Sequence, residues 1–78
     1  MRIVSENRKI DVPYDAYTIT ILDEHIVAVN GDTSVGFRLA HPETQRQATR
    51  ALNAIQDAYL SGAKIVYMDY IMEEVRDE

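Results

Sequence analysis

The chain has 78 residues and a mass of 8.9 kDa, a size that suits one small domain over residues 1–78 and excludes a two-domain enzyme. Eight Lys and Arg residues against 13 Asp and Glu residues give a net charge of −5, which argues against direct nucleic-acid binding because phosphates would be repelled. The chain has no cysteine for disulfide or thiolate chemistry, and no apolar stretch reaches the roughly 18 residues of a membrane span. We therefore expect a protein of the cytoplasm that does not bind a membrane.

Short strands are predicted along the first part of the chain. β-Branched residues at 2–5 and 10–12 flank a polar turn and predict a hairpin, which Pro13 ends because proline lacks a backbone donor. Residues 17–22 form the next predicted strand, because nearly all of them are β-branched or aromatic. The solvent face of this strand is expected to carry Thr18, Thr20 and Leu22.

A second hairpin is predicted around Asn30-Gly31, the pair best able to adopt the positive φ angles of a type I′ turn. It would join a strand at residues 26–29 to a strand at residues 34–39. Alternation in the second strand predicts that three apolar side chains share the buried face: Val35, Phe37 and Leu39.

An amphipathic helix is predicted after this hairpin. Pro42 suits its first turn, where the missing N–H would have no partner, and Gly62 suits a left-handed cap beyond its end. Apolar residues recur at helical spacing and form one stripe, which we interpret as core: Ala48, Ala51, Leu52, Ile55, Ala58 and Tyr59. Residues 65–68 then predict a last strand that is apolar on both faces.

These elements predict an α+β fold in the order β-β-β-β-β-α-β. One helix with an apolar stripe and one sheet with an apolar face can bury each other in two layers. We expect a small antiparallel sheet of about five to six strands, with the helix packed on one face. Whether residues 70–76 form a strand, a helix or a frayed end stays open, and the apolar surplus there favours a homo-oligomer, most simply a homodimer.

The usual enzyme motifs are missing from the sequence. His25 and His41 are far apart in the chain without metal-ligand spacing, and we interpret them as solvated or capping side chains. No nucleophile elbow, phosphate loop or dinucleotide-binding motif is present, and Asp11 and Asp15 are interpreted as surface or turn acids. We expect no enzymatic activity, no catalytic residue, no metal and no cofactor.

The segment from residue 69 onward is acidic and is interleaved with aromatic and apolar side chains. Such a segment can engage a basic protein surface, because opposite charge speeds encounter and the apolar residues supply affinity. The candidate partner-binding residues are Tyr67, Asp69, Tyr70, Met72, Glu73 and Glu74. The competing interpretation is an acidic end that only aids solubility.

Two arginines four positions apart lie on the polar face of the predicted helix. Arg46 and Arg50 are candidate contacts for an anion or for an acidic partner surface. The competing interpretation is a solvated helix face on which Arg50 lies near Glu43 or Asp57.

The opening of the chain carries a resemblance. Residues 1–5 (MRIVS) and 10–15 (IDVPYD) resemble the start of a family of small uncharacterised proteins from phages, prophages and mobile elements of Gram-positive bacteria, which begin with MRI-(V/L)-S and I-D-(V/L)-P-Y. The later order of a strand meander, an Ala-rich helix, Gly62 and a last strand is also similar. The resemblance implies a small accessory protein acting inside a bacterial host cell, and it carries no site residues with it.

Three functions follow as hypotheses. The leading one is a non-enzymatic phage or mobile-element accessory protein that binds a host protein, as an acidic inhibitor of a nucleic-acid-handling or defence factor. The second is a structural or assembly subunit of a phage complex. The third is an oligomer that sequesters a nucleotide or similar small molecule, with Arg38, Arg46 or Arg50 meeting the phosphate.

Overall fold

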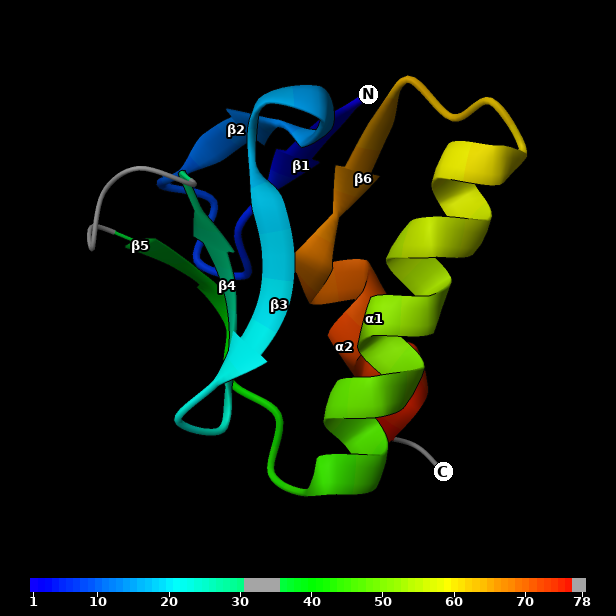
Figure 1. The fold of residues 1–78 in the computed structure, drawn as a ribbon. Coiled ribbons are helices and arrows are strands. Elements are labelled where there is room, and N and C mark those ends of the chain that lie inside the picture. The colour runs from blue at the N-terminus through cyan, green and yellow to red at the C-terminus, as the bar shows by residue number, and fades with distance from the viewer. Residues whose placement is uncertain (31–35, 77–78) are drawn as a thin grey trace.

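The computed structural model of the protein describes residues 1–30 and 36–76. Six strands are described, with a 3-10 helix between the second and third and two α-helices in the second half (Figure 1). The elements are β1 (Arg2–Val4), β2 (Asp11–Pro13), η1 (Tyr14–Ala16), β3 (Thr18–Leu22), β4 (His25–Val29), β5 (Gly36–Ala40), α1 (Gln45–Leu60), β6 (Ile65–Tyr67) and α2 (Met68–Arg76). The predicted α+β class is confirmed.

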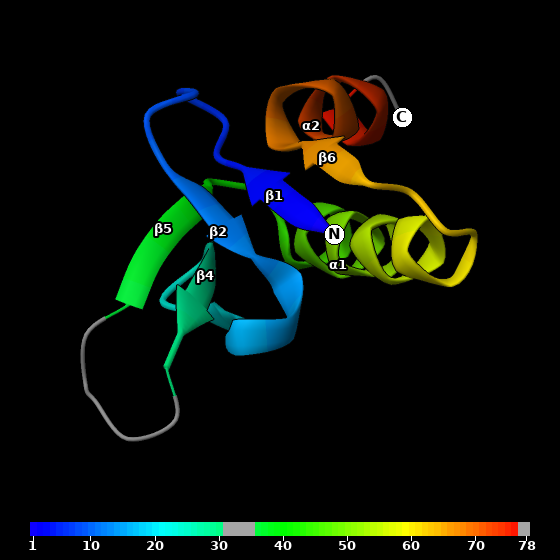
Figure 2. The same ribbon diagram turned by 90° about the horizontal axis from the view of Figure 1, so that it is seen from above.

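The expectation of one antiparallel sheet is wrong, because the described strands form two three-stranded sheets. The first has the order β2-β1-β6, in which β1 pairs antiparallel with β2 and parallel with β6 (Figure 2). The second is the antiparallel meander β3-β4-β5. Pro13 and the η1 turn separate β2 from β3, and α1 carries the chain back so that β6 runs parallel to β1.

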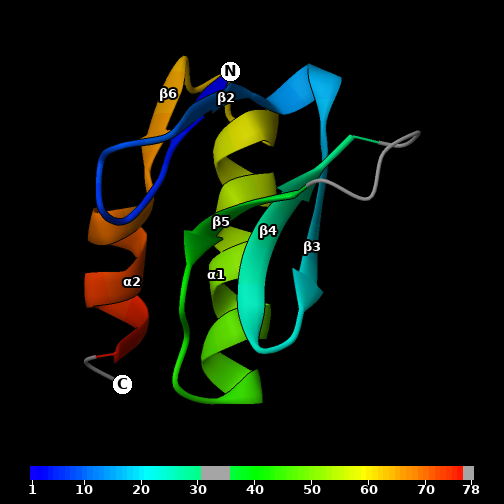
Figure 3. The same cartoon turned by 90° about the vertical axis from the view of Figure 1, so that its left-hand side faces the viewer.

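Helix α1 covers one face of the β3-β4-β5 sheet, while Figure 3 shows that no other element crosses in front of the opposite face among the described residues. Small side chains allow this close packing, since Ala48 and Ala51 of the helix and Ala28 of the sheet are all buried. The largest fully buried apolar side chains come from both sheets and both helices: Ile3, Ile26, Leu39, Ile55, Met68 and Met72. The predicted stripe is only partly core, because Leu52 is half-buried and Tyr59 is exposed, stacked 4.7 Å from the ring of Tyr14.

The ends of α1 are set by local chemistry. Thr44 is the N-cap and accepts a hydrogen bond from the N–H of Gln47 at 3.1 Å, so Pro42 precedes the helix instead of lying in its first turn. Gly62, with a φ of 85°, follows the last turn as the predicted left-handed residue.

The pairing of β4 with β5 confirms a hairpin between the two predicted strands. Gly31 of the predicted Asn30-Gly31 turn and Val35 lie outside the described residues. Leu39 is buried as predicted, whereas Phe37 is 37% exposed, and its ring and that of Tyr17 meet in a T-shaped pair. On β3, Thr18 and Leu22 are exposed and Thr20 is half-buried, so the predicted solvent face is largely confirmed.

Residues 68–76 form helix α2, which answers the question that the sequence left open. Its apolar side chains return at helical spacing, and Met68, Met72 and Val75 are buried in the core. Most of the apolar side chains that favoured a homo-oligomer are therefore buried within the chain itself. The homo-oligomer stays a prediction, with less exposed apolar surface to support it.

Candidate functional site

The predicted partner-binding residues lie where the turn between β1 and β2 meets the start of α2. Ser5 organises this turn. The residue is 1% exposed, and its hydroxyl donates to Asn7 Oδ1 at 2.7 Å and accepts from the Ile10 N–H at 3.0 Å. The turn also places Arg8 at a φ of 64°. Arg8 thereby reaches across to residues 67–70, about 60 positions later in the chain.

Arg8 binds two tyrosines and one carboxylate at once. Its guanidinium carbon lies 4.3 Å from the centre of the Tyr67 ring and 5.2 Å from that of Tyr70, within the range of cation–π attraction. Its Nη2 lies 2.9 Å from Asp69 Oδ2, and the two tyrosine rings meet edge to face at 5.7 Å. The hydrogen bond to Asp69 raises the pKa of Arg8 above its ordinary value, so this arginine stays charged under working conditions.

The outer part of this site belongs to the exposed face of α2. Tyr70 is 60% exposed, and Glu73 and Glu74, three and four residues further on, are exposed beside it. We call the group the Tyr70 surface, and its members are Arg8, Tyr67, Asp69, Tyr70, Glu73 and Glu74. It carries one arginine against three carboxylates and so remains acidic.

Two of the predicted partner contacts need correction. Met72 is fully buried and presents no surface to a partner, because the helical turn directs it inward with Met68. Asp69 does not offer an unpaired carboxylate to a partner, since Arg8 pairs with it. Arg8 itself was missed in the sequence, because nothing in the local pattern links residue 8 to residue 69.

The candidate anion contacts lie on α1. Arg46 and Arg50 line a pocket of about 190 Å³ beside Thr44 and Gln47 of α1 and Val75 of α2. Arg46 is exposed and Arg50 half-buried. Arg38 is on β5 and lines two other pockets, so the three arginines do not form one phosphate site.

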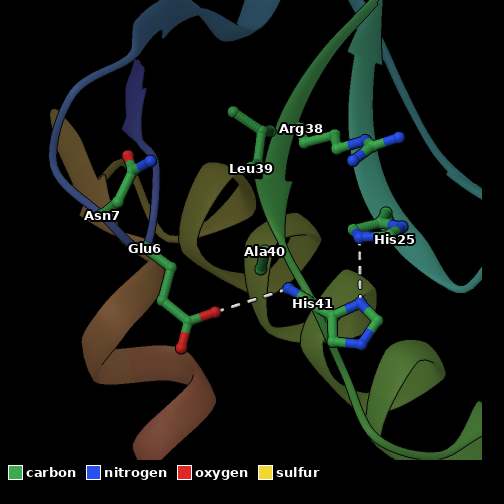
Figure 4. A pocket seen from close by; sticks show the side chains of 7 residues that line it. All are labelled: Glu6, Asn7, His25, Arg38, Leu39, Ala40 and His41. Carbon is green, nitrogen blue, oxygen red and sulfur yellow. Dashed lines mark hydrogen bonds between the residues drawn. The ribbon is translucent and has the colours of Figure 1, made fainter.

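A third site brings together side chains that the sequence did not connect. An open pocket of about 290 Å³ lies between the β1–β2 turn and the ends of β4 and β5, with Glu6, Asn7, Arg38 and both histidines on its walls (Figure 4). His25 Nε2 and His41 Nδ1 face each other at 3.0 Å, and their ring centres are 4.3 Å apart. His41 is exposed and His25 Nδ1 lies 2.9 Å from the carbonyl oxygen of Asp23 in the adjoining turn, in keeping with the predicted solvated or capping roles, but the sequence did not indicate that the two rings meet.

A group of hydrogen bonds among Glu6, Arg76 and His41 holds one wall of this pocket, and we call this group the latch. Both carboxylate oxygens of Glu6 contact the guanidinium of Arg76, which also donates from Nη2 to the carbonyl oxygen of His41 at 2.9 Å. Glu6 also donates its backbone N–H to the Leu39 carbonyl at 2.7 Å. The hydrogen bond to Glu6 raises the pKa of Arg76 above its ordinary value. The latch thus joins the β1–β2 turn, the end of β5 and the end of α2.

Comparisons with protein-family models, with curated proteins and with solved structures gave no match for this chain. Function therefore has to be argued from the sites themselves.

Nowhere in residues 1–30 and 36–76 do three His, Cys, Asp or Glu side chains converge as a metal-ion cluster. Asp11 is paired with Arg2 at 2.8 Å, and Asp15 is exposed in η1. None of the helices in the same ranges is long and apolar enough to cross a membrane.

Proposed function

We propose that this protein is a non-enzymatic binding protein whose Tyr70 surface docks on a basic surface of another protein. The observation that carries the proposal is the packing of Arg8 against Tyr67 and Tyr70 while the Tyr70 ring stays 60% exposed. Tyrosine and arginine are the residue types that dominate binding energy in interfaces. Here their side chains are held in place before binding, which lowers the entropy lost on docking.

The negative charge of the Tyr70 surface favours a partner with a basic surface. Glu73 and Glu74 flank Tyr70 on the same helix face, and the whole chain has a net charge of −5. Because Arg8 is already paired with Asp69, a partner would meet the two free glutamates first. Proteins that handle nucleic acid carry complementary basic surfaces. We therefore propose a host nucleic-acid-handling or defence factor as the partner, in the bacterial cell that the resemblance implies.

The test begins with capture from a bacterial host lysate by the tagged full chain, followed by titration of the purified partner with variants. We expect Tyr70→Ala to weaken binding at least tenfold, because it removes the exposed anchor. Glu73→Gln with Glu74→Gln should slow association and flatten its salt dependence.

Two control variants make the comparison sharp. Leu60→Ala removes an apolar side chain that is 81% exposed at the far end of α1, and Asp57→Asn removes an exposed charge from α1. Both should bind as the unmodified protein does. If Tyr70→Ala binds as tightly as Leu60→Ala, or if affinity is the same at low and high salt, this function is wrong.

A second candidate function is sequestration of a phosphorylated small molecule. It is favoured by the pocket where Arg46 and Arg50 lie beside Thr44 at the start of α1. A nucleotide that binds there would raise the melting temperature, and Arg46→Gln would remove the shift. No shift across a panel of nucleotides would exclude this candidate.

The structural-subunit hypothesis rests on a different surface. Ile65, which is 43% exposed at the start of β6, lies on an edge strand of its sheet and offers an apolar contact for a second copy. Light scattering at high protein concentration tests it, since a strict monomer would leave it without support.

A further inference from the structure

The histidine pair is the feature of the molecule that the proposed function does not use. These are the only two histidines in the chain, and the fold brings them together from the start of β4 and from the link between β5 and α1. His25 is half-buried and His41 is exposed, on the wall of an open pocket (Figure 4). The chain has no cysteine, so these imidazoles are its strongest ligands for a transition metal.

Hydrogen bonding fixes the state of one ring. His25 Nδ1 lies 2.9 Å from the carbonyl oxygen of Asp23, and a carbonyl oxygen can only accept, so Nδ1 carries the hydrogen. In the neutral ring Nε2 then has the free lone pair, and Nε2 is the atom that faces His41. Metal-binding histidines are commonly oriented in this way, by donation from the other ring nitrogen to a backbone carbonyl.

We propose that His25 Nε2 and His41 Nδ1 together bind one divalent transition-metal ion, with water completing the coordination. The two nitrogens are 3.0 Å apart. Two ligands about 2.0–2.1 Å from one ion lie about 3 Å apart when their angle at the ion is about 90°, the angle of square-planar and octahedral sites. A tetrahedral ion needs about 3.3 Å. The pair therefore suits Cu²⁺ and Ni²⁺ better than Zn²⁺.

Binding requires only a change of tautomer in the second ring. When the ion takes the lone pair of His41 Nδ1, the hydrogen that bonds the two rings moves to His41 Nε2. The two metal–nitrogen bonds replace two bonds between the ion and water, and no net proton is released from the neutral pair. The pocket of about 290 Å³ leaves room for the water ligands.

The surrounding charges affect the affinity of the site for a metal ion. Arg38 lies beside His25 on the same pocket wall and opposes a cation, while the carboxylate of Glu6 is engaged by Arg76 (Figure 4). A phosphate-like anion in this pocket would instead be attracted by the positive charge of Arg38. Arg38→Gln therefore separates the two ligand classes, because it should tighten a cation and loosen an anion.

The experiment titrates Cu²⁺, Ni²⁺, Zn²⁺ and Mg²⁺ separately into the full chain. We expect one Cu²⁺ or Ni²⁺ per chain, weaker binding of Zn²⁺ and none of Mg²⁺. The electron paramagnetic resonance spectrum of the Cu²⁺ complex should show coupling to two imidazole nitrogens. His41→Gln and His25→Gln should each weaken Ni²⁺ binding at least tenfold, and Arg38→Gln should strengthen it about two- to fivefold.

The controls guard against misfolding and against other ligands. His41 is exposed, so His41→Gln should keep the circular dichroism spectrum and melting temperature of the unmodified protein. Thr49→Ala, an exposed change elsewhere on α1, should bind Ni²⁺ normally. Ni²⁺ affinity unchanged in His41→Gln, or a Cu²⁺ spectrum without imidazole nitrogens, would overturn the proposal. So would inorganic phosphate binding that Arg38→Gln abolishes.

Discussion

At the scale of single residues, Ser5 holds together the turn between β1 and β2. It is the one buried polar residue among the described part of the chain, and its hydroxyl bonds with both Asn7 and the N–H of Ile10. These bonds shape the turn that delivers Glu6 to the latch and Arg8 to the Tyr70 surface. Both candidate sites therefore depend on a side chain that contacts neither partner nor metal.

Ser5→Ala is expected to lower the free energy of unfolding by about 1–3 kcal/mol, because the buried Ser5 hydroxyl is the hydrogen-bond partner of the half-buried Ile10 N–H. Chemical denaturation measures this change. Ser61→Ala is the matched control, since it removes a serine hydroxyl bond from an exposed position and should change stability by less than about 1 kcal/mol. Equal effects of the two substitutions would contradict the role given to Ser5.

At the scale of elements, the C-terminal end of α1 was more easily predicted than its start. Gly62 marked the end because a positive φ favours glycine. Pro42 suggested too early a start, because the helix is capped two residues later by Thr44. Helix α2 has apolar side chains at helical spacing at Met68, Met72 and Val75, but the acidic residues between them equally fit a frayed end, so the sequence alone leaves this segment open.

Thr44→Ala is expected to destabilise the protein by about 1 kcal/mol, because the N–H of Gln47 loses its capping oxygen. Thermal or denaturant unfolding followed by circular dichroism measures the loss. Thr49→Ala is the control within the same helix, where alanine has the better helix propensity and the side chain is exposed. It should leave stability unchanged or slightly raised, and a loss equal to that of Thr44→Ala would rule out the capping role.

At the scale of the whole molecule, the sequence predicted the class and the local elements but not how distant segments meet. A three-residue strand such as β1 contains no pattern that distinguishes a parallel partner at residues 65–67 from an antiparallel one. The pairing of Arg8 with Asp69 spans 61 positions, and that of His25 with His41 spans 16. Such contacts follow from packing of the complete chain, so both candidate sites needed the structure.

The latch between Glu6 and Arg76 joins segments 70 positions apart, and its ion pair can be measured in a double-mutant cycle. With Glu6→Gln and Arg76→Gln we expect a favourable interaction of about 0.5–1 kcal/mol that shrinks in high salt. The pair between Arg2 and Asp11 is the control, because its side chains are about half exposed against about a third in the latch. It should give the smaller value, and the reverse order would refute a stabilising latch.

The place of β1 at the centre of its sheet has a consequence for the order of folding. Its parallel partner β6 lies more than 60 residues later, whereas β3, β4 and β5 are neighbours in the chain. During synthesis the meander can form soon after it leaves the ribosome, while β1 must wait for nearly the whole chain before its second edge is paired. Pulse-labelling hydrogen exchange during refolding should accordingly protect the amides of β4 before those of β1, and simultaneous protection would show that the two sheets fold as one unit.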